Sequence, residues 1–276
     1  MSDHVAASER PGAAAGTVVV HPDAETLAEA VAARLALALL DAQATRGSAT
    51  VVLTGGTIAE KLYRSLRESP LRDVVDWSAV DVWWGDERFL PAGHPDRNET
   101  QARAALLDAL PLTPARVFAM PASDGPDGDD AEAAAARYAS SLAAAGVAGG
   151  RGSEPARGFD VLLLGIGEDG HVASIFPGHP VVRETLAVSA VHGSPKPPPT
   201  RITLTLPLIN TAREVWLVAA GDGKADAVAR ALATEPTGPV PGSGRPPPVP
   251  AAAVRGVEHT RWLLDRTAAA RLPRLG

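Results

Sequence analysis

The chain contains no cysteine among its 276 residues, and this absence excludes several kinds of chemistry at once. Without thiols the protein forms no disulfide, uses no thiolate nucleophile and builds no cysteine-ligated zinc site. The histidines outside the motifs described below show no ligand spacing among themselves, so we expect no metal site. The activity should therefore need neither thiol chemistry nor a bound metal ion.

Basic charge and long apolar runs are also scarce. Lys and Arg total 26 against 32 Asp and Glu, so the formal charge is −6 and no overall basic field exists to hold nucleic acid. No uncharged apolar stretch approaches the ~20 residues of a membrane-spanning helix, and residues 1–16 lack the apolar core of a signal peptide. The composition predicts a cytoplasmic protein that binds a small molecule, and neither nucleic acid nor a membrane.

Apolar β-branched runs alternate with segments of helical period along most of the chain. We expect strands at 18–20, 49–53, 80–84, 117–120, 159–164, 185–191, 201–206, 214–220 and 262–264. We expect helices at 27–39, 58–66, 98–110 and 131–145, another after residue 224, and a short one at the end of the chain. This alternation predicts an α/β, Rossmann-like fold, in which a mostly parallel sheet is flanked by helices.

The chain is predicted to form a single domain over residues 17–276, preceded by a disordered tail at 1–16. Two stretches near 146–158 and 235–250 are rich in glycine or proline, and we expect both to be mobile surface loops. Neither is flanked by enough independent apolar sequence to mark a domain boundary.

The most informative segment is 165–177, which follows the apolar run at 159–164. Its glycines leave room for a ligand close to the backbone, as a strand end in an α/β active site requires. Asp169 and His171 add a carboxylate and a group that titrates near neutrality. A glycine-rich turn with a solvated histidine is the alternative interpretation.

A second glycine motif follows the strand expected at 49–53 and precedes a helix. In Thr54-Gly55-Gly56-Thr57 the glycines let a phosphate approach the backbone N–H groups, and the threonines add hydroxyl donors. A simple turn with a threonine helix cap is the alternative. The motif is neither a Walker loop nor Gly-x-Gly-x-x-Gly, so it does not indicate nucleotide binding.

A charged cluster marks the end of the strand expected at 80–84. The planar guanidinium of Arg88 suits phosphate or carboxylate oxygens, and Asp86 or Glu87 could orient it or bind a sugar hydroxyl. A surface ion-pair network is the alternative, because such residues often only solvate a loop. We expect Asn98 to cap the next helix.

Two lysines also stand near expected strand ends. Lys224 lies in the first turn of a helix, where its charge opposes the helix dipole, so a ligand explains it better than helix support does. Lys196 precedes the strand at 201–206 and could also reach a phosphate, but we expect it to lie in a solvated loop.

Taken in chain order, five segments carry a resemblance to a known family. They are Gly55-Gly56-Thr57, Gly85-Asp-Glu-Arg88 with Pro91 and Asn98, Gly165-Ile-Gly-Glu-Asp-Gly-His171 through Phe176-Pro177-Gly178, Arg201-Ile-Thr-Leu-Thr205, and Gly221-Asp-Gly-Lys224. From about Val18 to Leu264 the chain resembles the 6-phosphogluconolactonases, which share a Rossmann-like fold with glucosamine-6-phosphate deaminases and isomerases. The resemblance implies hydrolysis of 6-phospho-D-glucono-1,5-lactone to 6-phosphogluconate, the second step of the pentose phosphate pathway, without a cofactor.

The resemblance also implies roles for individual residues. His171 would be the catalytic base, and Asp169 would stabilise its imidazolium or orient a sugar hydroxyl. Binding of the substrate or its phosphate is expected of Gly55, Gly56, Thr57, Asp86, Arg88, Gly167, Lys224 and Arg201, the last without a defined role. N–H groups of the turn at 165–170 could bind the oxyanion that forms at the lactone carbonyl.

Two alternatives and three departures qualify the resemblance. A deaminase or isomerase would resemble Gly-His-Ile-Ala-Phe-Asn-Glu-Pro at the histidine, whereas this chain has no carboxylate after His171 until Glu184. A sugar-phosphate-sensing regulator would normally carry a basic DNA-binding module, and none precedes Val18. Many relatives carry Ser where this chain has Thr57 and Arg97, and the stretch at 235–250 is longer than expected.

Overall fold

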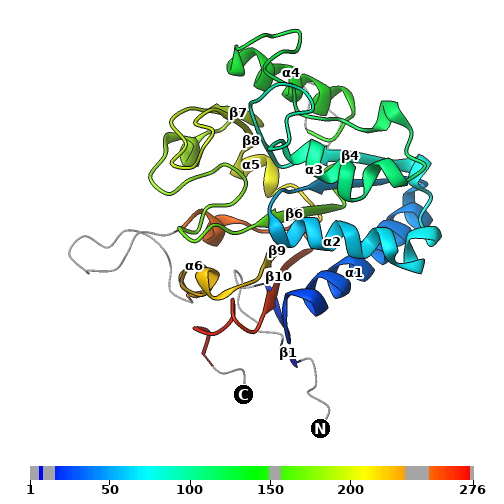
Figure 1. Cartoon of the computed structure of the whole chain (residues 1–276), viewed down its shortest axis with the longest axis vertical. Coiled ribbons are helices and arrows are strands. Elements are labelled where there is room, and N and C mark those ends of the chain that lie inside the picture. The colour runs from blue at the N-terminus through cyan, green and yellow to red at the C-terminus, as the bar shows by residue number, and fades with distance from the viewer. Residues whose placement is uncertain (1–5, 9–15, 149–156, 234–248, 274–276) are drawn as a thin grey trace.

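The computed structural model describes residues 6–8, 16–148, 157–233 and 249–273, and a seven-stranded sheet runs through its centre (Figure 1). Across the sheet the strands are β1 (Ala6–Ser8), β2 (Thr17–His21), β10 (His259–Asp265), β9 (Glu214–Ala219), β6 (Val161–Gly165), β3 (Ala49–Leu53) and β4 (Val80–Trp84). All neighbouring strands are parallel except β1, which is antiparallel to β2. The predicted mostly parallel sheet with flanking helices is confirmed.

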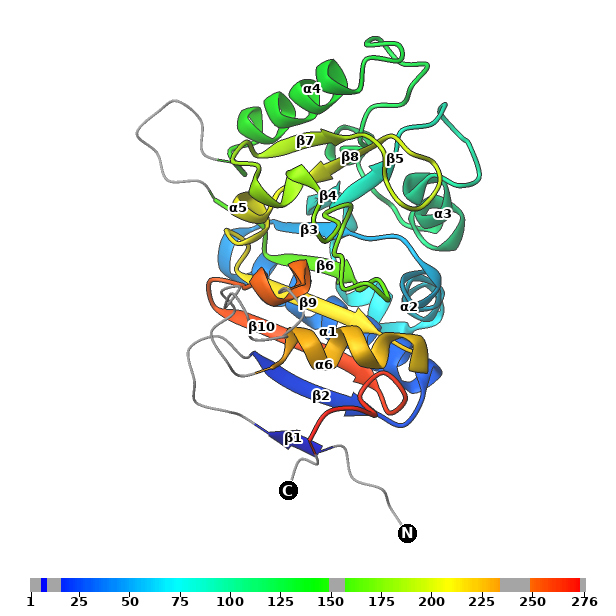
Figure 2. The same cartoon turned by 90° about the vertical axis from the view of Figure 1, so that its left-hand side faces the viewer.

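Helices cover both faces of this sheet. The helices α1 (Ala24–Arg46) and α2 (Thr57–Glu68) lie on one face and α6 (Ala225–Ala231) on the other (Figure 2). The carboxylate of Asp23 accepts a hydrogen bond from the N–H of Thr26 at the start of α1, and Gly47 ends the helix with a φ of 75°. Of the described helices, none is both long and apolar enough to cross a membrane.

A second sheet, smaller and antiparallel, lies beside the edge of the first. Its strands are β5 (Asp86–Arg88), β8 (Arg201–Leu204) and β7 (Val188–Val191), in that order, and α4 (Ala131–Ala144) packs against β7 and β8. The apolar runs at 185–191 and 201–206 are strands as expected, but shorter. Thr205 ends the second run, because Leu206-Pro207 begins the short helix α5 (Leu206–Ile209).

Three expected elements differ in the structure. Residues 117–120 form only an isolated bridge between Val117 and Val82, since prolines at 114 and 121 bracket the segment. The helix expected at 98–110 is α3 (Asn98–Ala105) followed by a separate 3₁₀ turn. After β10 the chain forms turns instead of a helix.

Part of the segment predicted to be a disordered tail forms β1, which satisfies backbone groups at the otherwise open edge of β2. The rest of 1–15 and most of the two predicted loops, 149–156 and 234–248, lie outside the described residues. Val249, at the end of the proline-rich stretch, is buried, and the N–H of Ala251 donates to the carbonyl of Gly170. This end of the stretch therefore packs onto the turn that carries His171.

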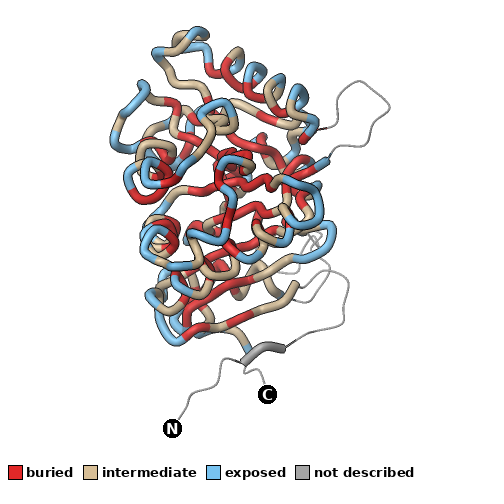
Figure 3. Tube along the Cα trace, turned by 90° about the vertical axis from the view of Figure 1, so that its right-hand side faces the viewer, coloured by how far each residue is buried: buried red, intermediate tan, exposed pale blue. Residues whose placement is uncertain are grey.

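The core lies between the central strands and the inner faces of the helices (Figure 3). Strands β3 and β4 are buried at every position, as continuous apolar runs predict for a sheet covered on both faces. These rigid strands end at a common edge, where the polar motifs begin.

Candidate active site

A cavity of about 610 Å³ opens at the carboxyl ends of the parallel strands. Thr54 follows β3, Gly165 ends β6, Ala220 follows β9 and Asp265 ends β10, and all four line it. The predicted site residues that line the same cavity are Gly55, Gly56, Thr57, Asp86, Arg88, Gly167, His171, Arg201 and Lys224. The fold thus brings together motifs that are separated by up to 170 positions in the sequence.

His171 and Asp169 form a hydrogen-bonded pair at this edge. The Nδ1 atom of His171 lies 2.5 Å from Oδ1 of Asp169, and the ring packs against Phe176 with centroids 4.6 Å apart. An ionised carboxylate only accepts hydrogen bonds, so Nδ1 carries the proton, and no hydrogen bond from the described residues engages the lone pair of Nε2. The pair has the arrangement of a general base with an orienting carboxylate.

The electrostatics of the pair favour a neutral imidazole beside an ionised carboxylate. Burial lowers the pKa of His171 below its usual value and Lys196 acts in the same direction, while Asp169 opposes them. Burial alone would raise the pKa of Asp169, but its interactions with His171 and the charge of Lys196 outweigh burial and lower that pKa. At neutral pH, His171 can therefore accept a proton.

The glycines of the turn make this close packing possible. A Cβ atom on Gly167 would lie 2.1 Å from Nδ1 of His171, so only glycine fits there. Gly170 has a φ of 89°, and a Cβ on it would meet Val249. The N–H groups of Gly165, Gly167 and Gly170 donate to Thr54 Oγ1, His171 O and Gly167 O respectively. These three glycine donors are therefore already used within the protein, and oxyanion binding by other N–H groups of the turn stays a prediction.

The phosphate motif is the start of α2. Gly56 precedes the first turn with a φ of 103°, and no side chain caps the helix. The threonine-cap alternative is therefore wrong, and the first-turn N–H groups have no side-chain cap at the cavity. The hydroxyl of Tyr63 donates to the carbonyl of Thr54 at 2.7 Å and accepts from its N–H at 3.0 Å, which fixes the strand end against α2.

Arg88 and Asn98 form one wall of the cavity. The guanidinium of Arg88 donates to Asn98 Oδ1 at 3.0 Å, and the amide of Asn98 donates to the carbonyl of Asp86 at 2.9 Å. A Cβ on Gly55 would lie 2.0 Å from Asn98 Oδ1, so this wall abuts the phosphate motif. Asn98 is the first residue of α3 and not its cap, and its side chain lines the cavity.

Lysines also line the cavity. Burial lowers the pKa of Lys224, and the charge of Lys196 lowers it further. Lys196 is exposed as expected, yet it lines the cavity. Arg201 donates to the carbonyls of Lys196 at 3.1 Å and Pro197 at 3.0 Å, so it shapes the segment that carries Lys196.

Sequence reasoning missed Asn98, Lys196 and Asp265 as cavity residues. Asp265 accepts from the N–H of Gly221 through both carboxylate oxygens and so holds the turn before Lys224. Asn98 carried a signal because it recurs in the resemblance beside Arg88, and Lys196 carried one as a cation near an expected strand end. Within the described ranges, no three His, Asp or Glu side chains gather as a metal site would require.

Comparisons with known proteins identify relatives along nearly the whole chain. The model of the glucosamine-6-phosphate isomerases/6-phosphogluconolactonase family matches residues 22–262. A 6-phosphogluconolactonase of Streptomyces coelicolor is 59% identical over 93% of this chain and 95% of its own length, and one of Mycobacterium tuberculosis is 46% identical over 93% and 98%.

Solved structures give the same result. The 6-phosphogluconolactonase of Trypanosoma brucei superposes with a TM-score of 0.78 at 29% identity, covering 95% of this chain and all of that one. A monomeric glucosamine-6-phosphate deaminase, 22% identical with a TM-score of 0.70, shares the fold. The chain belongs to the glucosamine-6-phosphate isomerase/6-phosphogluconolactonase family.

Proposed function

We propose that this chain is an enzyme that hydrolyses 6-phospho-D-glucono-1,5-lactone to 6-phosphogluconate, in the pentose phosphate pathway of the cytoplasm. The observation that carries the proposal is the hydrogen-bonded His171–Asp169 pair, whose imidazole lines a cavity with an excess of positive charge. Among the described residues that line it, five are cationic and two are carboxylates. A phosphorylated substrate supplies the missing negative charge.

In the proposed mechanism, Nε2 of His171 removes a proton from water as the water attacks C1 of the lactone. Asp169 stabilises the imidazolium that results, and the carbonyl oxygen becomes an oxyanion. When the tetrahedral intermediate collapses, the bond from C1 to the ring oxygen breaks, and the imidazolium returns its proton to that oxygen. The histidine is then neutral again, and the open-chain carboxylic acid that forms loses its remaining proton to solvent to give the carboxylate.

The cationic side chains divide between the two ends of the substrate. We assign the phosphate to the first turn of α2, Arg88 and Lys224, which supply N–H donors and fixed positive charge. We assign the oxyanion to Lys196, because its charge acts on both His171 and Asp169 and it has no recorded ion pair within the described residues. These roles need no cofactor.

The deaminase alternative is weaker because of the residues around His171. In the described part of the chain, Asp169 is the only carboxylate that hydrogen-bonds the imidazole of His171. After His171 the sequence continues to the buried hydrophobic residues Ile175 and Phe176 instead of a carboxylate. An aminosugar phosphate should therefore not be deaminated. The absence of ammonia release from glucosamine 6-phosphate would be the expected control result.

The test is hydrolysis of freshly generated 6-phosphogluconolactone, corrected for spontaneous opening, by the wild type and by His171→Ala. We expect fast turnover that falls by about 10²–10⁴-fold in the variant. Turnover that survives the substitution would overturn the base assignment, and no turnover in the wild type would overturn the lactonase proposal.

A further inference from the structure

Glu87 is buried under the cavity wall and does not line the cavity. Its side chain is 1% exposed, and its carboxylate accepts three backbone N–H bonds. Oε1 accepts from Arg88 at 2.8 Å and from Asn98 at 2.7 Å, and Oε2 accepts from Glu99 at 2.9 Å. One carboxylate therefore ties β5 to the start of α3.

Both of the elements joined by Glu87 contribute a side chain to the cavity. Arg88 comes from β5 and Asn98 from α3, and the two are bonded to each other. Arg97, the residue before α3, does not cap this helix with its side chain. Glu87, which lies in β5, accepts the first N–H groups of α3 instead and so acts as the cap. Any movement of the Glu87 carboxylate would therefore change the relative position of Arg88 and Asn98.

Arg97 is a buried cation beside both Glu87 and Glu99, and its Nη2 lies 3.4 Å from Oε2 of Glu99. It is also 1% exposed, and its Nη2 lies 3.8 Å from Oε2 of Glu87. The same guanidinium donates to the carbonyls of Met120 at 2.7 Å and Leu90 at 3.1 Å, which fixes it from two further segments. A charge buried without such compensation would be strongly unfavourable.

We propose that Glu87 and Arg97 are positioning residues that hold Arg88 and Asn98 in the geometry that binds the substrate phosphate. The pair does not touch the substrate and acts only through the two cavity side chains. This inference rests on the proposed function, because it takes the phosphate to lie against Arg88. It predicts a loss of binding with the chemical step preserved, since binding of a remote phosphate contributes equally to ground and transition states.

The test is Glu87→Gln, measured by calorimetric binding of 6-phosphogluconate and by lactone hydrolysis. The glutamine amide would turn a donor toward the N–H of Glu99 or toward Arg97, so the junction should loosen. We expect Kd and KM to rise at least about tenfold, with kcat per folded enzyme within about twofold of the wild type. Unchanged Kd and KM, with only a lower melting temperature, would overturn the proposal.

Asp81→Asn is the matched control. Asp81 is also buried and pairs with Arg116 at 2.9 Å and Arg157 at 3.1 Å, but it lies at the opposite end of β4. The Asp81→Asn substitution should lower the stability of the protein without changing Kd or KM. A similar rise in Kd and KM in the Asp81 and Glu87 variants would contradict a specific role for Glu87.

If the Glu87→Gln variant does not fold, Glu87→Asp replaces it in the test, because aspartate keeps the negative charge beside Arg97. The shorter side chain cannot reach all three N–H groups, so the same rise in Kd is expected, and an unchanged Kd would again overturn the proposal. Calorimetry separates this inference from the proposed function. If the wild type binds 6-phosphogluconate but does not hydrolyse the lactone, the proposed function fails and the positioning role is still tested.

Discussion

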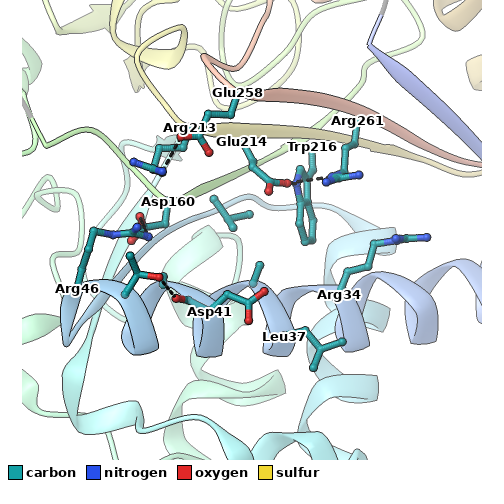
Figure 4. A pocket seen from close by; sticks show the side chains of 14 residues that line it. Arg34, Leu37, Asp41, Arg46, Asp160, Arg213, Glu214, Trp216, Glu258 and Arg261 are labelled. Atoms are coloured by element: carbon teal, nitrogen blue, oxygen red, sulfur yellow. Dashed lines mark hydrogen bonds and ion pairs between the residues drawn. The ribbon is translucent and has the colours of Figure 1, made fainter. Parts of the chain in front are cut away.

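The two ends of the parallel sheet both carry clusters of charge, but they use it differently. At the amino ends, a pocket of about 360 Å³ between α1 and strands β6, β9 and β10 is lined by four arginines and four carboxylates (Figure 4). Ion pairs join Arg46 to Asp160 at 2.6 Å, Arg213 to Glu258 at 2.5 Å and Arg261 to Glu214 at 2.9 Å. There the charges balance, and most of them link one element to another.

At the carboxyl ends, the described cavity residues hold more positive than negative charge. Of the lysines, Lys61 pairs with Glu25, whereas no ion pair is recorded for Lys196 or Lys224 within the described residues. Burial and then the charge of Lys196 lower the pKa of Lys224, so a positive charge is unfavourable at this position without a counter-ion. The difference teaches that charged side chains paired with each other, as at the amino ends, hold the fold together. Cationic side chains without a partner in the protein, as at the carboxyl ends, indicate an anionic ligand.

The largest expected effect comes from removing the carboxylate that orients His171. Asp169→Asn leaves a side chain of the same size but removes the stabilisation of the imidazolium, so kcat should fall by about 10²-fold or more. Steady-state hydrolysis of the phosphorylated lactone measures it. A loss below about threefold would mean that Asp169 does not orient the base.

The next effect tests the unmatched charge directly. Lys224→Ala or Arg88→Ala should weaken substrate binding by about 1.5–3 kcal/mol, as lost charged hydrogen bonds do, and KM should rise accordingly. The kcat value should change much less. An unchanged KM would remove that residue from the phosphate site.

Lys196→Met should move the pH profile as well as the rate. Because the Lys196 charge lowers the pKa of His171, its loss should raise that pKa and shift the acidic limb of kcat/KM to higher pH. The kcat value should fall by about tenfold, less than for a buried oxyanion donor. Lys196→Arg is the control, and it should keep the limb of the wild type. A higher KM with an unmoved limb would place Lys196 at the phosphate instead.

The smallest effect is expected at the amino ends. Arg213→Ala breaks a pair in which both side chains are about 40% exposed, so stability should fall by about 0.2–1 kcal/mol at most. Urea unfolding measures this change, and KM should equal that of the wild type. A higher KM in this variant would show that the two ends are not independent.

Much of this arrangement could be predicted from the sequence, because the strands and their polar ends are local features. The glycines and His171 lie within a few residues of one another, so their meeting at the end of β6 needs no tertiary information. The phosphate motif was predicted for the same reason, since the end of β3 and the start of α2 are adjacent. Parallel strands then bring such ends to one edge.

The other features of the site depend on side-chain burial and on contacts between residues far apart in the sequence, and a local sequence pattern does not reveal these. Glu87 reads as part of a solvated charge cluster, yet it is buried and its pKa is raised to about 7, because burial outweighs the opposing effects of Arg97 and its hydrogen bonds. Lys196 lies at the cavity in a segment that Arg201, a residue five positions away, holds through the Lys196 carbonyl. The antiparallel sheet was also missed, since periodicity predicts a strand but not its partners.

The most direct test of the account compares two lactones that differ only in the phosphate. We would measure kcat/KM of the wild type for 6-phospho-D-glucono-1,5-lactone and for D-glucono-1,5-lactone, each corrected for spontaneous opening. The unmatched positive charge predicts a preference of about 10²-fold or more for the phosphorylated lactone. Equal values for the two lactones would contradict the claim that this charge exists to bind the substrate phosphate.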